Sequence, residues 1–193
     1  MRTIHRPIVL GVVILLCVGM WSLRHGARPI GVVIITLDTT RADRLSPYGF
    51  MDAPMPALDR LARDGVVFDR ATSVAPLTLP AHSSLFTGLV PPRHGVRDNG
   101  DPALGAAHTT LAEVLSSQGF RTGAFVGSAV LNADRGLAQG FEIYRGSVSF
   151  ETDPSQPLQR RAKEVISDAT HWLDQVAGSP YFLWVHLYDA HRP

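Results

Sequence analysis

Mainly apolar runs of strand length alternate along the chain with segments whose apolar residues recur at helical spacing. We predict strands at four such runs, 30–37, 66–68, 121–126 and 181–187, the first of them a buried parallel strand. We predict helices over 56–64, 81–87, 111–117 and 160–176. Strands that alternate with helices predict an α/β fold, with a mainly parallel sheet and helices on both faces. Two stretches rich in turn-forming residues, 89–109 and 147–158, are expected to be loops.

A further apolar run, residues 8–23, stands apart from this alternation. It has 16 residues without a charge and is flanked on both sides by arginines. A helix of this length spans about 24 Å, and flanking arginines extend its reach towards the ~30 Å hydrocarbon core. We therefore predict an uncleaved transmembrane signal anchor at 8–23, with 1–7 as a cytoplasmic tail and 24–29 as a linker. A cleaved signal peptide is the alternative. The domain that follows is expected outside the cytoplasm, on the periplasmic or extracellular side.

Composition narrows the class of protein. The 193 residues are 45% hydrophobic and 18% charged, with a formal net charge of +1, which suits one globular domain. The chain contains no basic run, so we expect no nucleic-acid partner. The single cysteine, Cys17, lies inside the apolar run, so the rest of the chain has no disulfide and no thiol chemistry.

Two residues carry candidate chemistry. Asp38 directly follows the strand at 30–37, and ligands of open α/β sheets bind outside the carboxyl ends of the strands. Thr78 precedes Pro80 and the predicted helix at 81–87. A strand-end carboxylate can bind a divalent cation, and a hydroxyl at a helix start can attack a charged ester with the help of that cation. By residue type alone, each has a plain alternative, because Asp38 can cap a turn and Thr78 can cap a helix.

The motifs around these residues resemble a known family. The segment Leu37-Asp-Thr-Thr-Arg-Ala-Asp-Arg-Leu45 is similar to the N-terminal signature of sulfatases in the alkaline phosphatase superfamily. The segment Thr78-Leu-Pro-Ala-His-Ser-Ser-Leu-Phe-Thr-Gly88 resembles the family's nucleophile motif. The closing Phe182-Leu-Trp-Val-His-Leu-Tyr-Asp-Ala-His-Arg-Pro193 also matches, so the resemblance covers roughly residues 30–193 in the family's order.

The resemblance implies an alkaline-phosphatase-like fold and a metal-dependent hydrolase of sulfate or phosphate esters. It implies that Asp38 is a metal ligand, and that Thr78 is both the nucleophile and a metal ligand. His82, one helical turn beyond Thr78, and His191, in the closing motif, are implied to be catalytic and to bind the substrate. Arg41 is implied to support the metal site. The implied cofactor is one or two divalent metal ions.

The chain departs from the family pattern at several positions. Sulfatases convert a Cys or Ser at the position of Thr78 to formylglycine, and Thr cannot be converted in this way. A Lys-His pair of the family is missing from 123–131, and His82 stands where sulfatases have Arg. These departures favour phosphate over sulfate esters without deciding between them. Asp38 lacks the second adjacent aspartate of many sulfatases, which favours Mn²⁺ or Zn²⁺ and leaves Ca²⁺ or Mg²⁺ as alternatives. His186, inside the last strand, is expected to be a core histidine.

The resembled family is more than twice as long as this chain and takes its remaining metal ligands from later sequence. We therefore expect residues 30–193 to be the N-terminal portion of a sulfatase-like domain, incomplete at its C-terminus. A missing C-terminal portion or a second chain would complete the site, which leaves open whether this chain is active by itself. Two other functions remain open: a catalytically incomplete sulfatase-fold binding or scaffold domain, and a phosphoglycerol- or phosphoethanolamine-type transferase. The expected partners are the ester substrate and, through 8–23, a membrane.

Overall fold

The computed structural model describes residues 30–146 and 159–191 of the 193-residue chain. The predicted anchor at 8–23, its flanking tail and linker, and the predicted loop at 147–158 lie outside these residues. Within the described ranges, no helix is long and apolar enough to cross a membrane. The compact unit that contains the described elements begins at Gly31.

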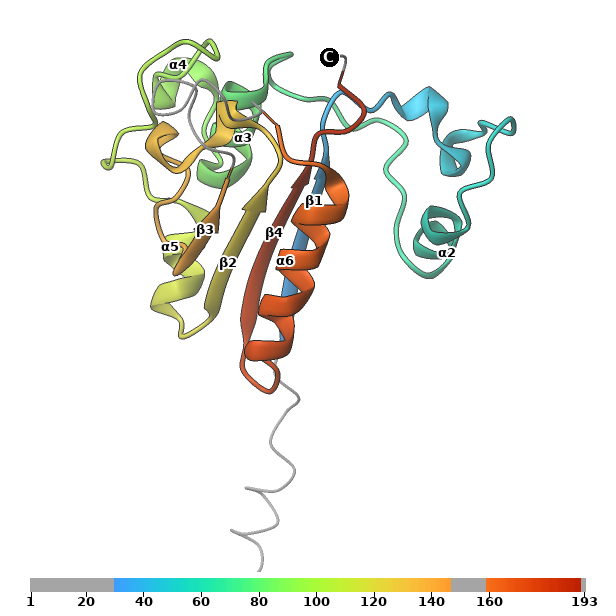
Figure 1. The fold of residues 1–193 in the computed structure, drawn as a ribbon. Coiled ribbons are helices and arrows are strands. Elements are labelled where there is room, and N and C mark those ends of the chain that lie inside the picture. The colour runs from blue at the N-terminus through green and yellow to red at the C-terminus, as the bar shows by residue number, and fades with distance from the viewer. Residues whose placement is uncertain (1–29, 147–158, 192–193) are drawn as a thin grey trace, which may run out of the picture. The chain divides into compact units, whose positions relative to one another are not determined.

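A four-stranded parallel sheet forms the centre of this unit, as the alternation of strands and helices predicts. Its strands are β1 (Gly31–Leu37), β2 (Arg121–Val126), β3 (Ile143–Arg145) and β4 (Tyr181–Leu187), in the spatial order β1-β4-β2-β3. All four strands run in the same direction in Figure 1, so their carboxyl ends meet at one edge of the sheet. Because β4 lies between β1 and β2, residues from distant parts of the chain meet at this edge.

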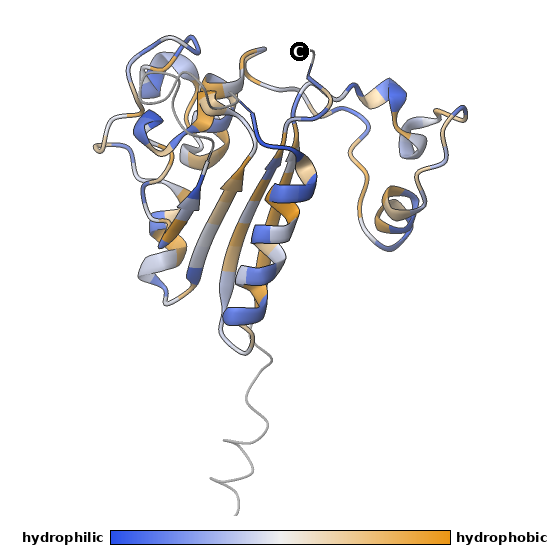
Figure 2. Cartoon of the chain, in the orientation of Figure 1, coloured by the Kyte–Doolittle hydropathy of each residue, from blue (hydrophilic) through white to orange (hydrophobic). Residues whose placement is uncertain are grey.

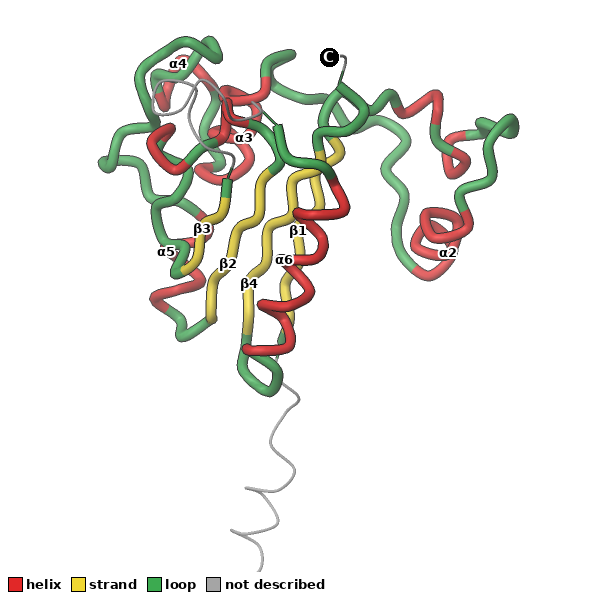
Figure 3. The backbone as a smooth tube through the Cα atoms, viewed as in Figure 1, coloured by secondary structure: helices red, strands yellow, loops and turns green. Residues whose placement is uncertain are grey.

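Helices cover both faces of the sheet, which confirms the predicted layer arrangement (Figures 1 and 3). On one face, α6 (Ala162–Gln175) packs its Trp172 against Phe125 of β2, with ring centroids 6.1 Å apart. On the other face, α3 (Thr78–Thr87) packs Phe86 against Trp184 of β4, at 4.5 Å between ring centroids. The helix α5 (Leu111–Ser117) lies on that second face and begins with a capping box, in which Thr110 and Glu113 bond each other's backbone amides.

The strand β1 is less buried than its sequence predicts. The run 30–37 is continuously apolar, which is typical of a strand covered on both faces. In the structure, β1 is an edge strand, and the side chains of Val33 and Ile35 are 46% and 57% exposed. Both pair in register with the α6-covered residues Leu183 and Val185, but α6 packs against β4 and β2. The strands beside α6 are coloured mainly as hydrophobic in Figure 2. The prediction of a buried strand is therefore wrong for this face of β1.

A long excursion connects β1 to α3 and makes few contacts with the sheet. It contains the 3-10 turns η1 (Ala42–Arg44) and η2 (Ser46–Tyr48) and the helix α2 (Pro56–Asp64), none of which buries a residue. The predicted helix at 56–64 is confirmed, with Pro56 as its first residue and Gly65 after its end. The predicted strand at 66–68 is wrong, because this segment forms no strand and leaves Val66 and Phe68 exposed.

Several other boundaries differ from the predictions. The helix α3 begins at Thr78, three residues earlier than predicted, so Thr78 belongs to its first turn and Leu77 is its N-cap. A short helix, α4 (Pro91–His94), interrupts the predicted loop at 89–109 and begins at the Pro91-Pro92 pair. The strand β3 and two 3-10 turns, η3 (Ala129–Leu131) and η4 (Ala133–Arg135), were not expected from the sequence, since short elements carry too few residues to show a period.

Candidate active site

Asp38 occupies the first position beyond β1, at the carboxyl edge of the sheet. Its backbone N–H donates to the carbonyl of Leu187 at 3.0 Å, which extends the pairing of β1 with β4 by one step. The chain then turns sharply at Thr39, whose φ of 54° lies in the left-handed region. A β-branched residue is strained there, at a cost of about 1–2 kcal/mol. This turn holds the Asp38 carboxylate at the sheet edge while the backbone leaves the sheet.

Thr78 meets Asp38 across forty residues of sequence. As the first residue of α3, Thr78 donates from Oγ1 to Oδ2 of Asp38 at 3.1 Å. The start of α3 is fixed from a separate loop, where Asn99 accepts the N–H of Leu79 on its Oδ1 at 2.9 Å. This bond satisfies one of the backbone amides that a helix start leaves without an intrahelical partner. The two predicted metal ligands, Asp38 and Thr78, are thus in direct contact.

His186 contributes a second donor to the same carboxylate oxygen. It lies on β4 and is fully buried, and its Nε2 stands 3.1 Å from Oδ2 of Asp38. Since the carboxylate accepts, the proton of this bond is assigned to Nε2. The sequence-based interpretation of His186 as a core histidine is right about its burial but misses this bond.

The environment of Asp38 stabilises its ionised form. Burial raises the pKa of Asp38, but the hydrogen bonds from His186 and Thr78 and the nearby histidines outweigh this effect, so the pKa lies below the ordinary value of 3.8. Asp38 is therefore a carboxylate at neutral pH. A mostly buried anion of this kind attracts a cation.

His82 stands on α3 one turn beyond Thr78 and bonds to its backbone rather than to its hydroxyl. The Nδ1–H of His82 donates to the carbonyl of Thr78 at 2.7 Å, so the lone pair of the neutral ring is on Nε2. The ring packs 5.5 Å from Trp184 and 5.0 Å from His186. Burial, reinforced by electrostatic interaction with the neighbouring His186, lowers the pKa of His82 to about 4, against the favourable contributions of the Thr78 carbonyl and Asp38. His82 is therefore neutral at physiological pH.

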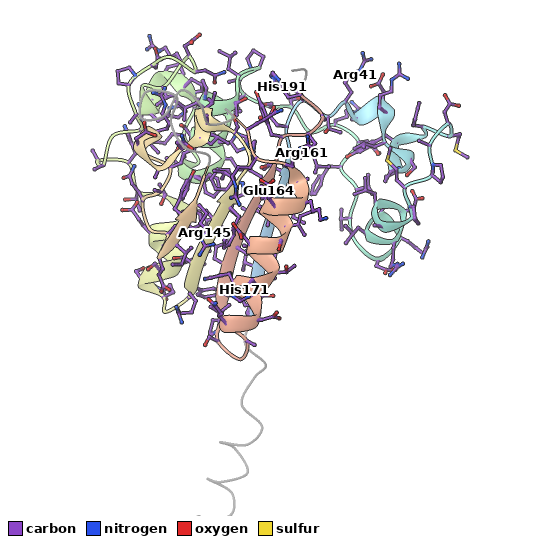
Figure 4. The ribbon with its side chains drawn as sticks, in the orientation of Figure 1. Arg41, Arg145, Arg161, Glu164, His171 and His191 are labelled. Carbon is purple, nitrogen blue, oxygen red and sulfur yellow. The ribbon has the colours of Figure 1, made fainter. Side chains whose placement is uncertain are left out.

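One cavity joins most of the predicted site residues. It has a volume of about 780 Å³, and Asp38, Thr78, His82 and His191 all line it. His191 is exposed at the carboxyl edge of the sheet, where its ring stacks on Tyr188 at 4.4 Å between centroids (Figure 4). Arg41 is not among the lining residues. Its guanidinium forms an exposed two-point pair with the carboxylate of Asp43, at 2.6 and 2.9 Å.

Comparison with known proteins decides the family. The family model described as Sulfatase matches residues 31–193, which is most of the chain. The chain belongs to the sulfatase family. Its fold has the same affiliation, since solved structures of sulfatases and other alkaline phosphatase superfamily members superimpose on it.

Three relatives of this sulfatase-family chain show the range of the similarity. The ulvan-active sulfatase of Formosa agariphila is 32% identical over 84% of the chain, which spans 35% of that protein. The phosphonate monoester hydrolase of Agrobacterium radiobacter superimposes with a TM-score of 0.69 at 22% identity, over 86% of this chain and 42% of the other. The C-terminal periplasmic domain of EcEptC from Escherichia coli, solved with Zn, gives 0.60 at 17% identity, over 86% and 45%. The chain therefore spans less than half the length of each.

Sulfatases generally use a divalent metal ion, and the donor atoms of this chain suit part of such a site. The Asp38 carboxylate and the Thr78 hydroxyl present oxygens 3.1 Å apart, and oxygen ligands bind hard and borderline divalent cations. Over 30–146 and 159–191, no group of three His, Cys, Asp or Glu side chains is placed to hold a metal. The described residues therefore supply a fraction of a coordination shell.

Two residues of the site's structure escaped the sequence analysis. His186 alternates with its neighbours like any strand residue, and only the pairing of β4 with β1 brings it to Asp38. Asn99 looks like part of a turn, and its bond to the start of α3 depends on the path of a loop. The sequence signal for His186 was a polar residue near the carboxyl end of an otherwise apolar run.

Proposed function

We propose that this chain carries the nucleophile side of a metal-dependent ester hydrolase, with Thr78 as the nucleophile and sulfate or phosphate esters as substrates. The observation that carries the proposal is the 3.1 Å bond from Thr78 Oγ1 to Asp38 Oδ2, because it joins the hydroxyl and the carboxylate that the chemistry requires. Membership of the sulfatase family supports the reaction class.

The chain's own residues divide the chemistry among them. Asp38 and Thr78 would hold the divalent cation, which supplies positive charge that makes the hydroxyl more acidic and neutralises the ester oxygens. Asp38 orients the Thr78 hydroxyl by accepting its hydrogen bond at Oδ2, and the hydroxyl proton passes to solvent water as the oxygen attacks. The Thr78 oxygen then forms a bond to phosphorus or sulfur while the bond to the ester oxygen breaks. His191, which lines the same cavity, gives a proton to the leaving oxygen, and water later cleaves the ester on Thr78.

His82 acts on the substrate side as a neutral hydrogen-bonding group. Its lowered pKa keeps it uncharged, and its Nδ1–H is already used on the Thr78 carbonyl. It therefore holds the first turn of α3 in place and offers Nε2 as an acceptor. In this protonation state His82 has no donor for an unprotonated ester oxygen, in contrast to the arginine of sulfatases.

The sulfatase relatives and the residues of the site favour different ester substrates. The curated relative that matches most of the chain is named a sulfatase, which favours sulfate. Thr78 cannot become formylglycine, which favours direct attack on phosphorus. A fold shared with a phosphonate monoester hydrolase is compatible with phosphoryl chemistry. We propose an enzyme that accepts phosphate esters and retains the site architecture of sulfate ester hydrolases.

Residues beyond those described complete the site in this proposal. Asp38 and Thr78 supply two oxygen ligands, fewer than any of the candidate cations binds. Further ligands come from a C-terminal portion of the sulfatase domain or from a second chain. The uncovered apolar face of β1 supports this, since side chains such as Ile35 lie ready for burial. Residues 8–23 anchor the domain to a membrane, with the site on the extracytoplasmic side.

A binding or scaffold function is the second candidate, and the incomplete ligand set is the observation that favours it. Transfer to a lipid or glycan hydroxyl, as in a phosphoethanolamine-type transferase, differs from the first proposal only in the acceptor that releases Thr78. A scaffold needs no cation at Asp38, so cation dependence separates the scaffold from both enzymatic functions.

The test is turnover of matched aryl phosphate, phosphodiester and aryl sulfate esters by the purified chain, with Mn²⁺ or Zn²⁺ added or chelated. The proposal expects cation-dependent turnover that is lost in Thr78→Ala. A folded wild-type chain without turnover would show that the site requires the further ligands and that this chain is not an enzyme by itself. Thr87→Ala is the matched control, because Thr87 is a hydroxyl at the other end of α3 that bonds the Ser83 carbonyl at 2.7 Å. Turnover that survives in Thr78→Ala would exclude Thr78 as nucleophile. The ester that is cleaved fastest shows whether the enzyme acts on phosphate esters, phosphodiesters or sulfate esters. Transfer of the group to an added alcohol in place of water identifies a transferase.

A further inference from the structure

We propose that His186 is a positioning residue that fixes the Asp38 carboxylate for cation binding and for its bond with Thr78. The inference rests on the proposed function where it concerns the cation. The hydrogen bond from His186 Nε2–H to Asp38 does not depend on the proposed function. His186 does not line the cavity that contains Asp38 and Thr78, so it acts through Asp38 and does not touch the substrate.

The backbone around His186 is held on both sides. His186 pairs with Thr36 of β1 and with Val126 of β2, so it lies in an interior strand of the sheet. The carbonyl of His186 accepts the N–H of Gly127 at 3.0 Å, and the carbonyl of the next residue, Leu187, accepts the N–H of Asp38. The donor and its carboxylate partner are thus fixed to each other through the ladder that joins β1 to β4.

The ring of His186 is confined by aromatic neighbours. Its side chain is 0% exposed. The ring lies edge-on to His82 at 5.0 Å and to Trp184 at 6.1 Å, and is tilted against Tyr188 at 6.0 Å. These contacts leave the ring little freedom to rotate or move away. The position of Nε2 is therefore set by packing.

The hydrogen bonds of the ring point to one task. Within the described ranges, Nδ1 of His186 is buried and has no hydrogen-bond partner, so the bond from Nε2 to Asp38 is the one that the side chain makes. A buried imidazole in the middle of an apolar strand loses hydration without full compensation. This loss is the expected consequence of placing a donor beside a carboxylate ligand, since partners of this kind orient the ligands of metal sites.

Both donors to Asp38 use the same oxygen. Thr78 Oγ1 and His186 Nε2 each lie 3.1 Å from Oδ2. Two donors on one oxygen fix the rotation of the carboxylate about its side-chain bond, which one donor alone would not do. Loss of the His186 donor would leave Asp38 with Thr78 as its single side-chain partner in the described residues.

The first arm of the test needs no cation. The full 193-residue chain is labelled with ¹⁵N at histidine, and the His186 ring signal is assigned by its loss in His186→Gln. The inference expects the Nε2–H tautomer in the wild type, with a ring proton that exchanges slowly. In Asp38→Ala the acceptor is gone, and exchange of that proton should become at least about tenfold faster. The opposite tautomer, or exchange unaffected by Asp38→Ala, would overturn the inference.

The second arm measures the affinity of the same chain for Mn²⁺ by paramagnetic resonance of the free ion. His186→Phe keeps a ring but has no donor, and His186→Gln keeps an amide donor close to the Nε2 position. We expect about a 10–100-fold loss of affinity in His186→Phe and at most about a threefold loss in His186→Gln. Thr122→Val is the control, since it removes a buried hydroxyl bond to the Gly140 carbonyl, away from the cavity.

The outcomes separate the inference from the function on which it rests. Equal Mn²⁺ affinity in the folded wild type and His186→Phe would refute the positioning role. A chain that binds no Mn²⁺ at all refutes the proposed function of the isolated chain. In that case the tautomer and exchange measurements still decide whether His186 holds Asp38. Should His186→Phe fail to fold, the wild-type tautomer and the exchange in Asp38→Ala decide the same question.

Discussion

Thr78 Oγ1 lies 3.1 Å from Asp38 Oδ2, although forty residues separate them in the sequence. The contact exists because β1 ends at Leu37 and α3 begins at Thr78, so a strand end and a helix start meet at the carboxyl edge of the sheet. Each residue alone is ordinary. Together they form the hydroxyl–carboxylate pair on which the proposed cation-dependent nucleophile rests.

The first prediction concerns the turn that directs Asp38. Thr39 adopts a φ of 54°, which is unfavourable for a β-branched residue and tolerated by asparagine. Thr39→Asn should therefore raise the free energy of unfolding by about 1 kcal/mol, measured by urea denaturation. Thr40→Asn, at the next position, has no positive φ to relieve and should give no gain. A Thr39→Asn variant no more stable than the wild type would show that Thr39 is not strained.

The second prediction concerns the pH dependence of stability through His82. Its folded-state pKa of about 4 lies below the ordinary 6.5, so the unfolded chain binds this proton first. The stabilisation is fully present above about pH 6.5 and is lost as the pH falls towards 4. Over that range we expect the free energy of unfolding to drop by about 3 kcal/mol on account of His82.

His82→Asn tests this expectation, because an asparagine can still donate to the Thr78 carbonyl but does not titrate. Its unfolding free energy should vary less with pH between 6.5 and 4 than that of the wild type. Parallel pH profiles for the wild type and His82→Asn would contradict the burial of a neutral His82.

The third prediction concerns the support of the start of α3 by Asn99. Asn99→Ala removes the acceptor of the Leu79 N–H, and the loss of such a cap costs about 0.5–2 kcal/mol. Because Leu79 follows Thr78, the same change should also weaken Mn²⁺ binding. Asp98→Ala is the matched control in the same turn, since its Oδ1 accepts only the N–H of Gly100. Equal effects of the two substitutions on stability and on Mn²⁺ affinity would argue against a role of Asn99 at α3.

The fourth prediction uses two neighbouring isoleucines of β1. Ile34 packs against the core beneath α3, whereas Ile35 points to the uncovered face and is 57% exposed. In this chain, Ile34→Ala should cost about 2–4 kcal/mol of unfolding free energy and Ile35→Ala less than about 1 kcal/mol. Chemical denaturation of both variants measures the difference. Comparable losses would mean that something covers the outer face of β1.

The main elements of the fold were predictable because their sequence patterns are local. The strands at 121–126 and 181–187 and the helices at 56–64 and 111–117 begin and end where the apolar periods and flanking Gly or Pro residues predict. The position of β1 in the sheet was not predictable in this way. A continuously apolar strand looks buried on both faces, and its exposure depends on how far α6 extends over the sheet.

The candidate site was predictable in its residues but not in its contacts. Asp38 and Thr78 stand out because they follow or begin regular elements, and their resemblance to family motifs assigns them roles. The bond from His186 depends on the register of β1 with β4, and the bond from Asn99 depends on a loop. Neither leaves a local sequence pattern. The catalytic and metal-binding roles of Asp38, Thr78, His82, His191 and Arg41 all stay predictions, as does the anchor at 8–23, which lies outside the described residues.

The most direct test of the central claim is to trap the ester on Thr78. The chain is incubated with Mn²⁺ and an aryl phosphate or aryl sulfate, quenched with acid, and analysed by peptide mass spectrometry. The account predicts a phosphoryl or sulfuryl group on the peptide that contains Thr78, absent from Asp38→Asn and after chelation of the metal. Turnover without modification of Thr78, or modification that persists in Asp38→Asn, would contradict it.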